Sequence, residues 1–453
     1  MSSEEKSVSG LGEGSPSPLT PHSSLSLWLA HLESLHPKGQ AGIELGLERL
    51  LQVKAALNQQ QFCPLITVGG TNGKGSTCAY LESILRATGY RVGCYTSPHL
   101  WEYNERVRIN GQPVADADLC AAFARVEAAR QSVGDVALTY FEFGTLAAWE
   151  VFAAAGLEAV ILEVGLGGRL DAVNAYEPDL AIVTSIDLDH TEWLGPTRED
   201  IGFEKAGIFR SGRPAFCADP QPPQRLLDHA AAIGVDLRLI GRDFGFQRDT
   251  ENRLQWRWWT RSGEQLIRRT LAFPGLRGPT QLYNAAVALA ALECLAERLP
   301  VTMQAIREGL IHTEIPGRFQ VVPGKPAIVL DVAHNPQAVR VLAENLGSMG
   351  FFDRTYAVVG MLADKDIAGA LAPLKGKVDY WYAATLDGTR GTSAAALQAV
   401  IEASGLGGEV ETFASPDVAM RAAIGRAGES DRILAFGSFY TVAGVREALQ
   451  NRR

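Results

Sequence analysis

A glycine-rich turn between an apolar run and a helical pattern is the strongest structural signal in this chain. Residues 65–77 read LITVGGTNGKGST, and the run Leu65–Val68 is typical of a buried strand. The run ends at two glycines, and apolar residues then recur at helical spacing. Glycines let backbone N–H groups approach phosphate oxygens, and a helix N-terminus adds positive potential. The turn is therefore predicted to hold the phosphates of a nucleotide, with Lys74 as a point charge.

This turn departs from the common phosphate-loop pattern. Counting back from Lys74, the usual first glycine position holds Val68, so the loop is one residue shorter and begins at Gly69. Gly75 also separates the lysine from the hydroxyl residues that follow it. The alternative interpretation is a tight strand-to-helix turn that carries one surface lysine.

Acidic and imidazole side chains follow two further apolar runs. Glu163 lies near the end of residues 159–164, and His190 follows residues 180–186. A carboxylate in a buried strand is costly unless it is paired or bound to a metal. Because parallel strands bring their carboxyl ends to one edge of a sheet, both side chains are expected beside the phosphate loop. There they would suit Mg²⁺, together with phosphate oxygens.

Another expected strand, residues 91–95, runs into Thr-Ser-Pro-His. Its position makes Ser97 and His99 candidates for the same crevice. His99 is equally well explained as a hydrogen-bonded loop histidine. The segment His36–Gln40 is either a plain connector or the lip of a substrate site.

Two other residues have ordinary explanations from spacing alone. Lys205 follows Glu204 on an expected helix over residues 200–209, and such a pair is typical of a solvated helix face. Asn284 precedes an expected helix over residues 285–299, where an asparagine is explained as an N-terminal cap.

Composition excludes several classes of protein. The chain has 453 residues, 46% of them apolar, and a net charge of −9, which argues against a nucleic-acid-coating surface. Its six cysteines form no CxxC pair, so neither a zinc site nor a disulfide framework is indicated, and a reducing, cytoplasmic location is expected. No apolar run has the length of a membrane span, and the N-terminus lacks a signal-peptide pattern.

The order of apolar runs predicts an α/β protein with two folded domains. Residues 1–22, rich in Ser, Gly, Pro and Glu, are expected to be a disordered tail. Residues 23–312 are expected to form a phosphate-loop ATPase domain with a mostly parallel sheet and, over the Trp-rich residues 253–269, a small β-meander. Residues 313–453 alternate strands and helices again, as in a smaller Rossmann-like domain.

Eight segments in this order resemble the folylpolyglutamate synthase and dihydrofolate synthase family, the folate branch of the Mur-type ligases. The resemblance runs from about residue 25 to the C-terminus. The segments are GGTNGKGS (69–76), TSPHL (96–100), TYFEFGTL (139–146), LEVGLGGRLDAVN (162–174), DHTEWLG (189–195), EKAGIFR (204–210), PGRF (316–319) and DVAHNP (331–336). One departure is Val173, where the family often has Thr, although Asp171 and Asn174 are kept.

The resemblance implies a role for each matching residue. ATP contacts are implied for Asn72, Gly73, Lys74, Gly75, Asn284, Arg318 and Asp331. Magnesium ligands are implied for Ser97, Glu163 and His190. The pterin-side pocket is implied for Thr139, Tyr140, Phe141, Leu170 and Asp171. Lys205 is implied to carry a carboxyl group on its side-chain nitrogen, which reverses the interpretation drawn from spacing, and His334 is implied to lie near the incoming glutamate.

The implied activity is ATP-dependent addition of L-glutamate to dihydropteroate and to folates through an acyl phosphate. ATP and Mg²⁺, at two sites, are the implied cofactors. The chain resembles bacterial bifunctional members, and a monomer with no nucleic-acid or membrane partner is expected. The alternatives are a monofunctional folylpolyglutamate synthase, another Mur-type amide ligase, and a phosphate-loop nucleotide switch. A switch would not need the set Glu163, His190 and Lys205.

Overall fold

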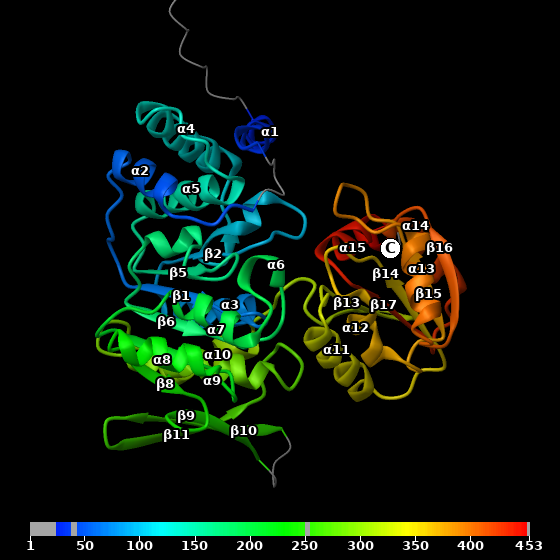
Figure 1. Cartoon of the computed structure of the whole chain (residues 1–453). Helices are drawn as coiled ribbons and strands as arrows, with labels where there is room; N and C mark the ends of the chain where they lie inside the picture. Colours follow the sequence, from blue (N-terminus) through cyan, green and yellow to red (C-terminus); the bar gives the residue numbers. More distant parts are fainter. Residues whose placement is uncertain (1–23, 38–42, 250–253, 451–453) are drawn as a thin grey trace, which may run out of the picture.

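The computed structural model describes residues 24–37, 43–249 and 254–450, and Figure 1 shows them as two lobes. The last helix of the N-terminal lobe is α10 (Met303–Ile311), and the first strand of the C-terminal lobe is β12 (Gln320–Val322). The expected tail, residues 1–22, and residues 38–40 of the predicted lip lie outside the described residues.

The N-terminal lobe is built on one large sheet. Its order is β4-β3-β2-β5-β1-β6-β7-β8. Strands β2, β5, β1, β6, β7 and β8 run parallel to one another, and β3 and β4 are antiparallel at one edge. The strands are β1 (Leu65–Gly69), β2 (Val92–Tyr95), β3 (Val107–Ile109), β4 (Gln112–Pro113), β5 (Ala159–Glu163), β6 (Leu180–Val183), β7 (Pro214–Cys217) and β8 (Asp236–Leu239). The mostly parallel sheet expected for this domain is confirmed.

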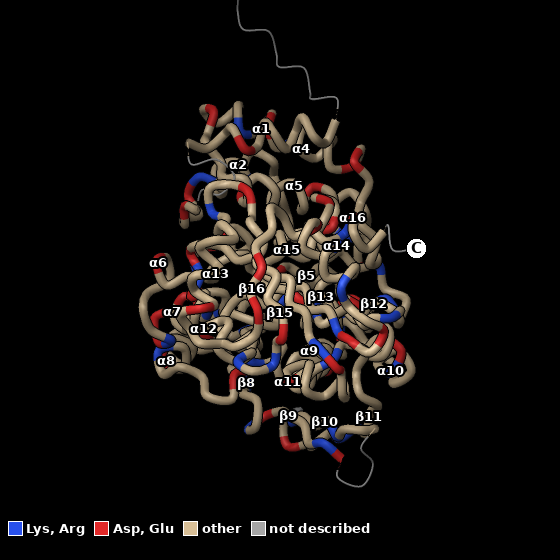
Figure 2. Tube along the Cα trace, turned by 90° about the vertical axis from the view of Figure 1, so that its right-hand side faces the viewer, with Lys and Arg blue, Asp and Glu red and all other residues tan. Residues whose placement is uncertain are grey.

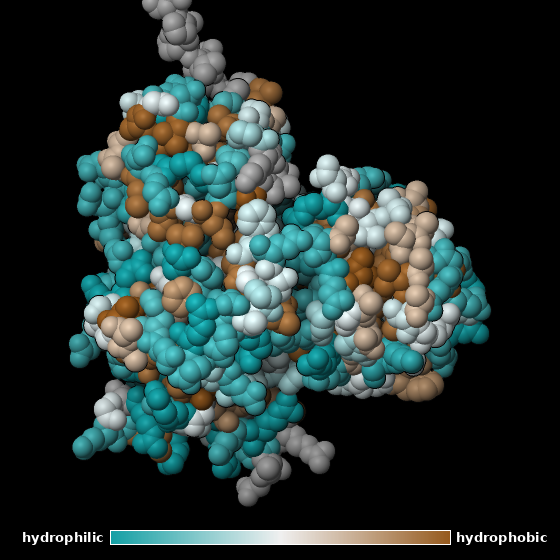
Figure 3. All heavy atoms as spheres, in the orientation of Figure 1, coloured by the Kyte–Doolittle hydropathy of each residue, from teal (hydrophilic) through white to brown (hydrophobic). Residues whose placement is uncertain are grey.

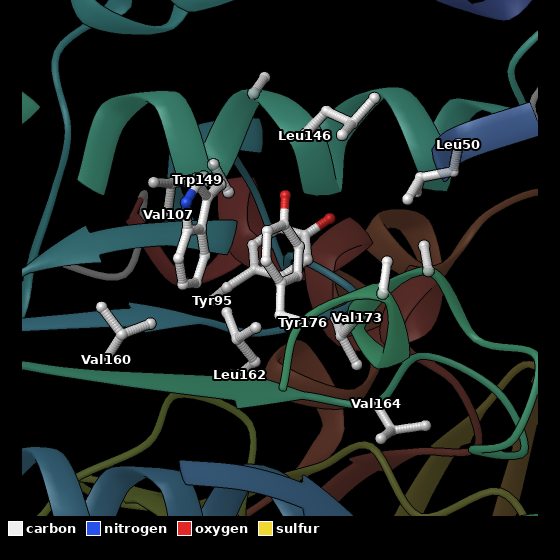
Figure 4. Packing of buried hydrophobic residues seen from close by; sticks show 14 of the residues in the cluster. Leu50, Tyr95, Val107, Leu146, Trp149, Val160, Leu162, Val164, Val173 and Tyr176 are labelled. Carbon is white, nitrogen blue, oxygen red and sulfur yellow. The ribbon is translucent and has the colours of Figure 1, made fainter. Parts of the chain in front are cut away.

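Helices cover both faces of this sheet, which explains why its central strands β1, β5 and β6 are buried at every position. One face packs on α1 (Leu25–Leu35), α2 (Glu48–Ala56), α4 (Asp116–Ser132), α5 (Tyr140–Ala154), α7 (Arg198–Ala206) and α8 (Gln224–Ala232). The other packs on α3 (Lys74–Thr88), α9 (Gln281–Cys294) and α10. In the first core, the rings of Trp149 and Tyr176 stack with centroids 4.1 Å apart, between α5 and the sheet (Figure 4).

A second, three-stranded antiparallel sheet covers α9 from outside. Its strands are β9 (Phe244–Arg248), β10 (Gln255–Ser262) and β11 (Gln265–Ala272), paired in sequence order as the predicted meander. Trp256 and Trp258 are buried in the core between this sheet and α9, and the Trp258 indole donates to the Ala286 carbonyl at 3.1 Å. These two tryptophans therefore stabilise the meander by packing.

The C-terminal lobe is a second α/β unit with sheet order β12-β13-β17-β14-β15-β16. Its strands after β12 are β13 (Ala327–Asp331), β14 (Thr355–Val359), β15 (Tyr380–Ala384), β16 (Glu409–Phe413) and β17 (Arg432–Phe436), and they are mutually parallel. One face packs on α11 (Pro336–Ser348), α12 (Ile367–Leu371) and α13 (Ala394–Ala403). The other packs on α14 (Pro416–Arg426), α15 (Phe439–Gly444) and α16 (Arg446–Gln450).

The predicted start of helix α9 was wrong. Helix α9 begins at Gln281 with Thr280 as its N-cap, so Asn284 lies inside the first turn and is not the cap. Its side chain is thereby free of a capping role and is buried against the phosphate loop.

The two lobes are in contact at mid-height, with a notch above their junction (Figure 3). Acidic and basic residues are interspersed along both lobes in the view of Figure 2. Within the described ranges, none of the helices combines the length and the apolar character needed to traverse a lipid bilayer.

Candidate active site

The loop from β1 into α3 has a shape that glycine adopts readily and other residues do not. Gly70 has φ +140°, and Gly73, the N-cap of α3, has φ +91°. A Cβ on Gly70 would lie 1.8 Å from Thr184 Oγ1, and one on Gly73 would lie 2.5 Å from Asn284 Oδ1. Both glycines are therefore required by backbone conformation and by close packing, and the N-terminus of α3 opens onto a cavity.

This cavity has a volume of about 130 Å³ and brings together residues from both lobes. The sequence-predicted residues in its wall are Asn72, Gly73, Lys74, Gly75, Ser97, Glu163, His190, Lys205, Arg318 and His334. Their individual roles stay predictions, but the shared location is observed. A helix N-terminus, a lysine and an arginine around one small polar cavity make it suitable for a polyphosphate.

Lys74 lies across the phosphate loop. Its Nζ donates to the carbonyl oxygens of Gly70 and Thr71 at 3.0 and 3.2 Å. Among the described residues, no carboxylate forms an ion pair with it. Its charge is therefore available to an anion in the cavity.

The donor atoms around Glu163 fit a divalent cation. The Glu163 carboxylate is buried, and its Oε2 accepts a hydrogen bond from the Ser97 backbone N–H at 3.0 Å. Burial raises the pKa of Glu163, while Lys74 opposes the rise. Carboxylate, hydroxyl and imidazole groups from Glu163, Ser97 and His190 are ligands that Mg²⁺ or Mn²⁺ accepts. In the described part of the chain no three His, Cys, Asp or Glu side chains gather as a metal cluster, so phosphate oxygens and water would complete the coordination.

His190 is held by an uncommon backbone conformation. It has φ +52° and directly precedes the short helix α6 (Thr191–Leu194). Burial lowers the pKa of His190 to about 4, so the imidazole is neutral at pH 7. A neutral ring keeps a lone pair on one nitrogen, which is the state that a metal ligand requires.

Lys205 is buried, contrary to the interpretation of Glu204 and Lys205 as a solvated pair. Its side chain is 3% exposed on α7, and Glu204 instead pairs with Arg169 at 2.8 Å. Burial, aided by repulsion from Lys74, lowers the pKa of Lys205 to about 7. No side chain in the described residues forms a hydrogen bond or ion pair with its Nζ. The amine is thus partly unprotonated at neutral pH and faces the cavity.

A second cavity of about 250 Å³ lies on the other side of the phosphate loop. Six predicted ATP contacts line it: Asn72, Gly73 and Gly75 from the phosphate loop, Asn284 from α9, and Arg318 and Asp331 from the C-terminal lobe. Asp331 is buried, and its carboxylate accepts the backbone N–H groups of Phe319 and Ala333 at 2.9 and 2.8 Å. Both lobes therefore contribute to one space that can hold a nucleoside.

The largest of these cavities, about 480 Å³, lies on the far side of Ser97 and Glu163. All five residues predicted for the pterin side line it, namely Thr139, Tyr140, Phe141, Leu170 and Asp171. Phe141 stacks on Tyr95 with ring centroids 5.8 Å apart. His99 lies here as a hydrogen-bonded loop histidine that accepts from Arg106 Nε at 2.8 Å.

Backbone contacts fix the shape of this cavity. Thr139 caps α5 reciprocally with Glu142: Thr139 Oγ1 accepts the Glu142 N–H at 3.2 Å, and Glu142 Oε2 accepts the Thr139 N–H at 2.7 Å. Asp171 accepts the N–H groups of Leu166 and Val173 at 2.8 and 3.0 Å, and burial raises its pKa to about 7. These two predicted substrate-binding residues therefore also hold the wall in place.

Sequence reasoning missed three residues of the C-terminal lobe that line the same cavity, Lys365, Arg390 and Phe439. Each follows the carboxyl end of a parallel strand, β14, β15 or β17. The strand-end argument that singled out Glu163 and His190 could have pointed to them.

The three cavities adjoin one another in a row, because neighbouring cavities share lining residues. Ser97, His190, His334 and Phe439 line both the 480 Å³ and the 130 Å³ cavities, and Asn72, Gly73 and Arg318 line both the 130 Å³ and the 250 Å³ cavities. The phosphate-sized cavity therefore lies between an aromatic-walled space and a nucleoside-sized space.

Comparison with known proteins agrees with this arrangement. Residues 68–292 match the Mur ligase middle domain, and residues 317–439 match the Mur ligase glutamate ligase domain. The dihydrofolate synthase/folylpolyglutamate synthase of Escherichia coli K12 is 47% identical over 95% of this chain and 97% of its own length, and that of Haemophilus influenzae is 40% identical over 93% and 96%. The chain belongs to the dihydrofolate synthase/folylpolyglutamate synthase family of Mur ligases.

Solved structures give the same result. Escherichia coli FolC in complex with DHPP and ADP aligns with TM-score 0.87 and 46% identity, over 96% of this chain and 100% of that one. A bifunctional folylpolyglutamate synthase/dihydrofolate synthase with Mn, AMPPNP and L-glutamate bound aligns with TM-score 0.84 and 47% identity, over 94% and 98%. The chain is thus an ATP-dependent ligase that joins glutamate to folates, with ATP and a divalent metal as its cofactors. The predicted family, fold class and reaction class are confirmed, and the nucleotide-switch alternative is excluded.

Proposed function

We propose that this enzyme adds L-glutamate both to dihydropteroate and to reduced folates, in one active site formed between the lobes. The observation that supports this is the row of adjoining cavities. The aromatic-walled cavity of about 480 Å³ shares Ser97 and His190 with the phosphate cavity, which shares Asn72 and Arg318 with the nucleoside cavity. A carboxylic acid in the first and ATP in the last would meet at the phosphate loop.

The proposed reaction activates the acceptor carboxylate by phosphorylation. A carboxylate oxygen attacks the γ-phosphorus, the bond to the β-phosphate oxygen breaks, and ADP leaves. The glutamate nitrogen then attacks the acyl carbon, phosphate leaves with the C–O bond electrons, and the nitrogen loses a proton. Lys74 and Arg318 line the space around the transferring group and would offset its negative charge.

Glu163, His190 and Ser97 are the residues that would hold the divalent metal, which supplies further positive charge to the phosphates when bound. We place one ion at this set, and a second ion is proposed beside Lys205. The Lys205 amine would attack carbon dioxide, form an N–C bond and release one proton, which leaves a carbamate anion. Its burial and its pKa of about 7 support this, since only the unprotonated amine is a nucleophile.

The C-terminal lobe closes the site against water, which would otherwise hydrolyse the acyl phosphate. Arg318 and His334 come from this lobe and line the phosphate cavity. His334 Nδ1 lies 2.8 Å from the Val332 carbonyl, and this contact orients the ring toward the cavity, where we place the incoming glutamate. The expected monomeric state, the cytoplasmic location and the absence of nucleic-acid partners stay predictions.

An ADP-release assay tests the proposal. With ATP and L-glutamate present, release should depend on the acceptor and should occur with dihydropteroate and with tetrahydrofolate. Activity with tetrahydrofolate alone would replace the bifunctional assignment by a monofunctional folylpolyglutamate synthase. Release that needs neither acceptor nor glutamate would contradict the proposed reaction.

A further inference from the structure

One carboxylate of the N-terminal lobe contacts three side chains of the C-terminal lobe, Lys365, Asn335 and His334, the last with its Nε2 at 3.9 Å from Asp189 Oδ2. Asp189 Oδ1 lies 2.7 Å from Lys365 Nζ, and Asp189 Oδ2 accepts from Asn335 Nδ2 at 3.3 Å. The side chains of Asp189 and Lys365 are 13% and 7% exposed, so water screens this ion pair little. Figure 1 shows α6, which directly follows this loop, on the side of the N-terminal lobe that faces the other lobe.

The same C-terminal segment also contacts the phosphate loop. Asn335 Nδ2 donates to Asn72 Oδ1 at 3.2 Å, and the Asn72 amide donates to Gln337 Oε1. Asn335 is fixed as the N-cap of α11, where its Oδ1 accepts the Ala338 N–H at 2.9 Å. A rigid helix start of one lobe is therefore bonded to both the phosphate loop and the loop of Asp189 in the other.

Asp189 lies beside the residues to which the proposed reaction is assigned. It directly precedes His190, and Lys365 Nζ lies 3.5 Å from His190 Nε2. His190 and Lys365 line the aromatic-walled cavity, and Asp189 and His190 line the phosphate cavity. Without the Asp189 charge, the buried Lys365 ammonium would lose its ion-pair partner, and the contact that joins the two lobes would be weakened.

We propose that Asp189 is a positioning residue that docks the C-terminal lobe onto the phosphate site and so keeps water from the acyl phosphate. This rests on the proposed function, because it assumes that a hydrolysable intermediate forms there. Asp189 does not touch the reacting atoms in this account. It acts through Lys365 and Asn335, whose positions set how tightly the shared wall of the two cavities closes.

The consequence is a specific failure when Asp189 loses its charge. In a loosely docked enzyme, water attacks the acyl carbon in place of the glutamate nitrogen, phosphate leaves, and the acceptor carboxylate is regenerated. ATP is then consumed without amide formation. A variant that is merely less stable loses ADP release and ligation together, whereas a docking defect raises the ratio of ADP to ligated glutamate above one.

The experiment measures ADP and ligated glutamate in parallel for the wild type, Asp189→Asn and the control Asp187→Asn. Asp187 lies on the same loop, and no contact to the C-terminal lobe involves it among the described residues. The wild type and the control should give a ratio near one. Asp189→Asn should ligate roughly tenfold more slowly or worse and show a ratio of about two or more.

Lys365→Met provides a second variant, because it leaves the Asp189 carboxylate without its ion-pair partner. The double variant should be no worse than the poorer single variant, because the two residues act as one unit. A ratio near one with turnover within about twofold of the wild type for Asp189→Asn would overturn the proposal. Strictly additive losses in the double variant would overturn it too. Absence of glutamate-dependent ADP release in the wild type would instead refute the proposed function.

Discussion

Replacing Lys205 by methionine should stabilise the unmodified protein while abolishing turnover. Lys205 is 3% exposed, and burial lowers its pKa from 10.5 to about 7. That shift corresponds to roughly 5 kcal/mol by which folding disfavours the ammonium relative to the amine. Methionine has a similar length and no charge, so the substitution removes this cost.

The sign of the pH dependence follows from the lowered pKa. Because the folded-state pKa lies below the unfolded value of 10.5, Lys205 costs no stability above that pH. The cost grows as the pH falls from 10.5 to about 7 and stays constant at lower pH. The gain from Lys205→Met is therefore largest near and below neutral pH and is small near pH 10.

Thermal unfolding in carbonate-free buffer at several pH values measures this effect. Lys205→Met should raise Tm by several degrees at neutral pH. The control Lys375→Met, at an exposed lysine, should leave Tm unchanged within about one degree.

Bicarbonate gives the second half of the test. It should raise Tm and turnover of the wild type, because a carbamate replaces the buried ammonium, and it should leave Lys205→Met unaffected. A short carboxylic acid such as acetate should partly rescue the turnover of Lys205→Ala. Near wild-type turnover of Lys205→Met, or an equal bicarbonate effect on both proteins, would refute the reasoning.

Three further outcomes follow from the cavities. Gly73→Ala should weaken ATP binding roughly tenfold or more by calorimetry, since its φ is +91° and a Cβ would lie 2.5 Å from Asn284 Oδ1; unchanged affinity would show that the loop does not need this shape. Phe141→Ala should raise KM for the acceptor roughly tenfold and leave ATP affinity unchanged. Weaker ATP binding with an unchanged KM for the acceptor would show that the acceptor does not bind in this cavity. Removal of divalent metal by EDTA should stop ADP release, and excess Mg²⁺ should restore it; release that persists would exclude the metal.

The parallel sheet explains what the sequence could predict about the site. Apolar runs such as residues 65–68 form buried strands, and parallel strands deliver their next residues to one edge. That rule alone predicted that Glu163 and His190 lie beside the phosphate loop. It applies locally, because each side chain lies close to the end of its own strand.

Features that depend on packing between distant segments were not accessible in this way. Spacing placed Lys205 on a solvated helix face, since a helix pattern does not reveal that the glycine-rich loop around Gly168 covers it. Asn284 fits the pattern of an N-cap, but α9 extends one turn further to Thr280. The pairing of Lys365 with Asp189 joins two lobes and leaves no mark in either local pattern.

Glutamate-dependent ADP release by Glu163→Gln shows whether the carboxylate at the end of β5 acts beside the phosphate loop. Glutamine keeps the size and the hydrogen bond from Ser97 but removes the charge. The control Glu158→Gln changes an exposed carboxylate at the start of the same strand. We expect Glu163→Gln to lose activity about a hundredfold or more without a lower Tm, and the control to keep wild-type turnover. Turnover of Glu163→Gln within about twofold of the wild type would contradict that role of the carboxylate.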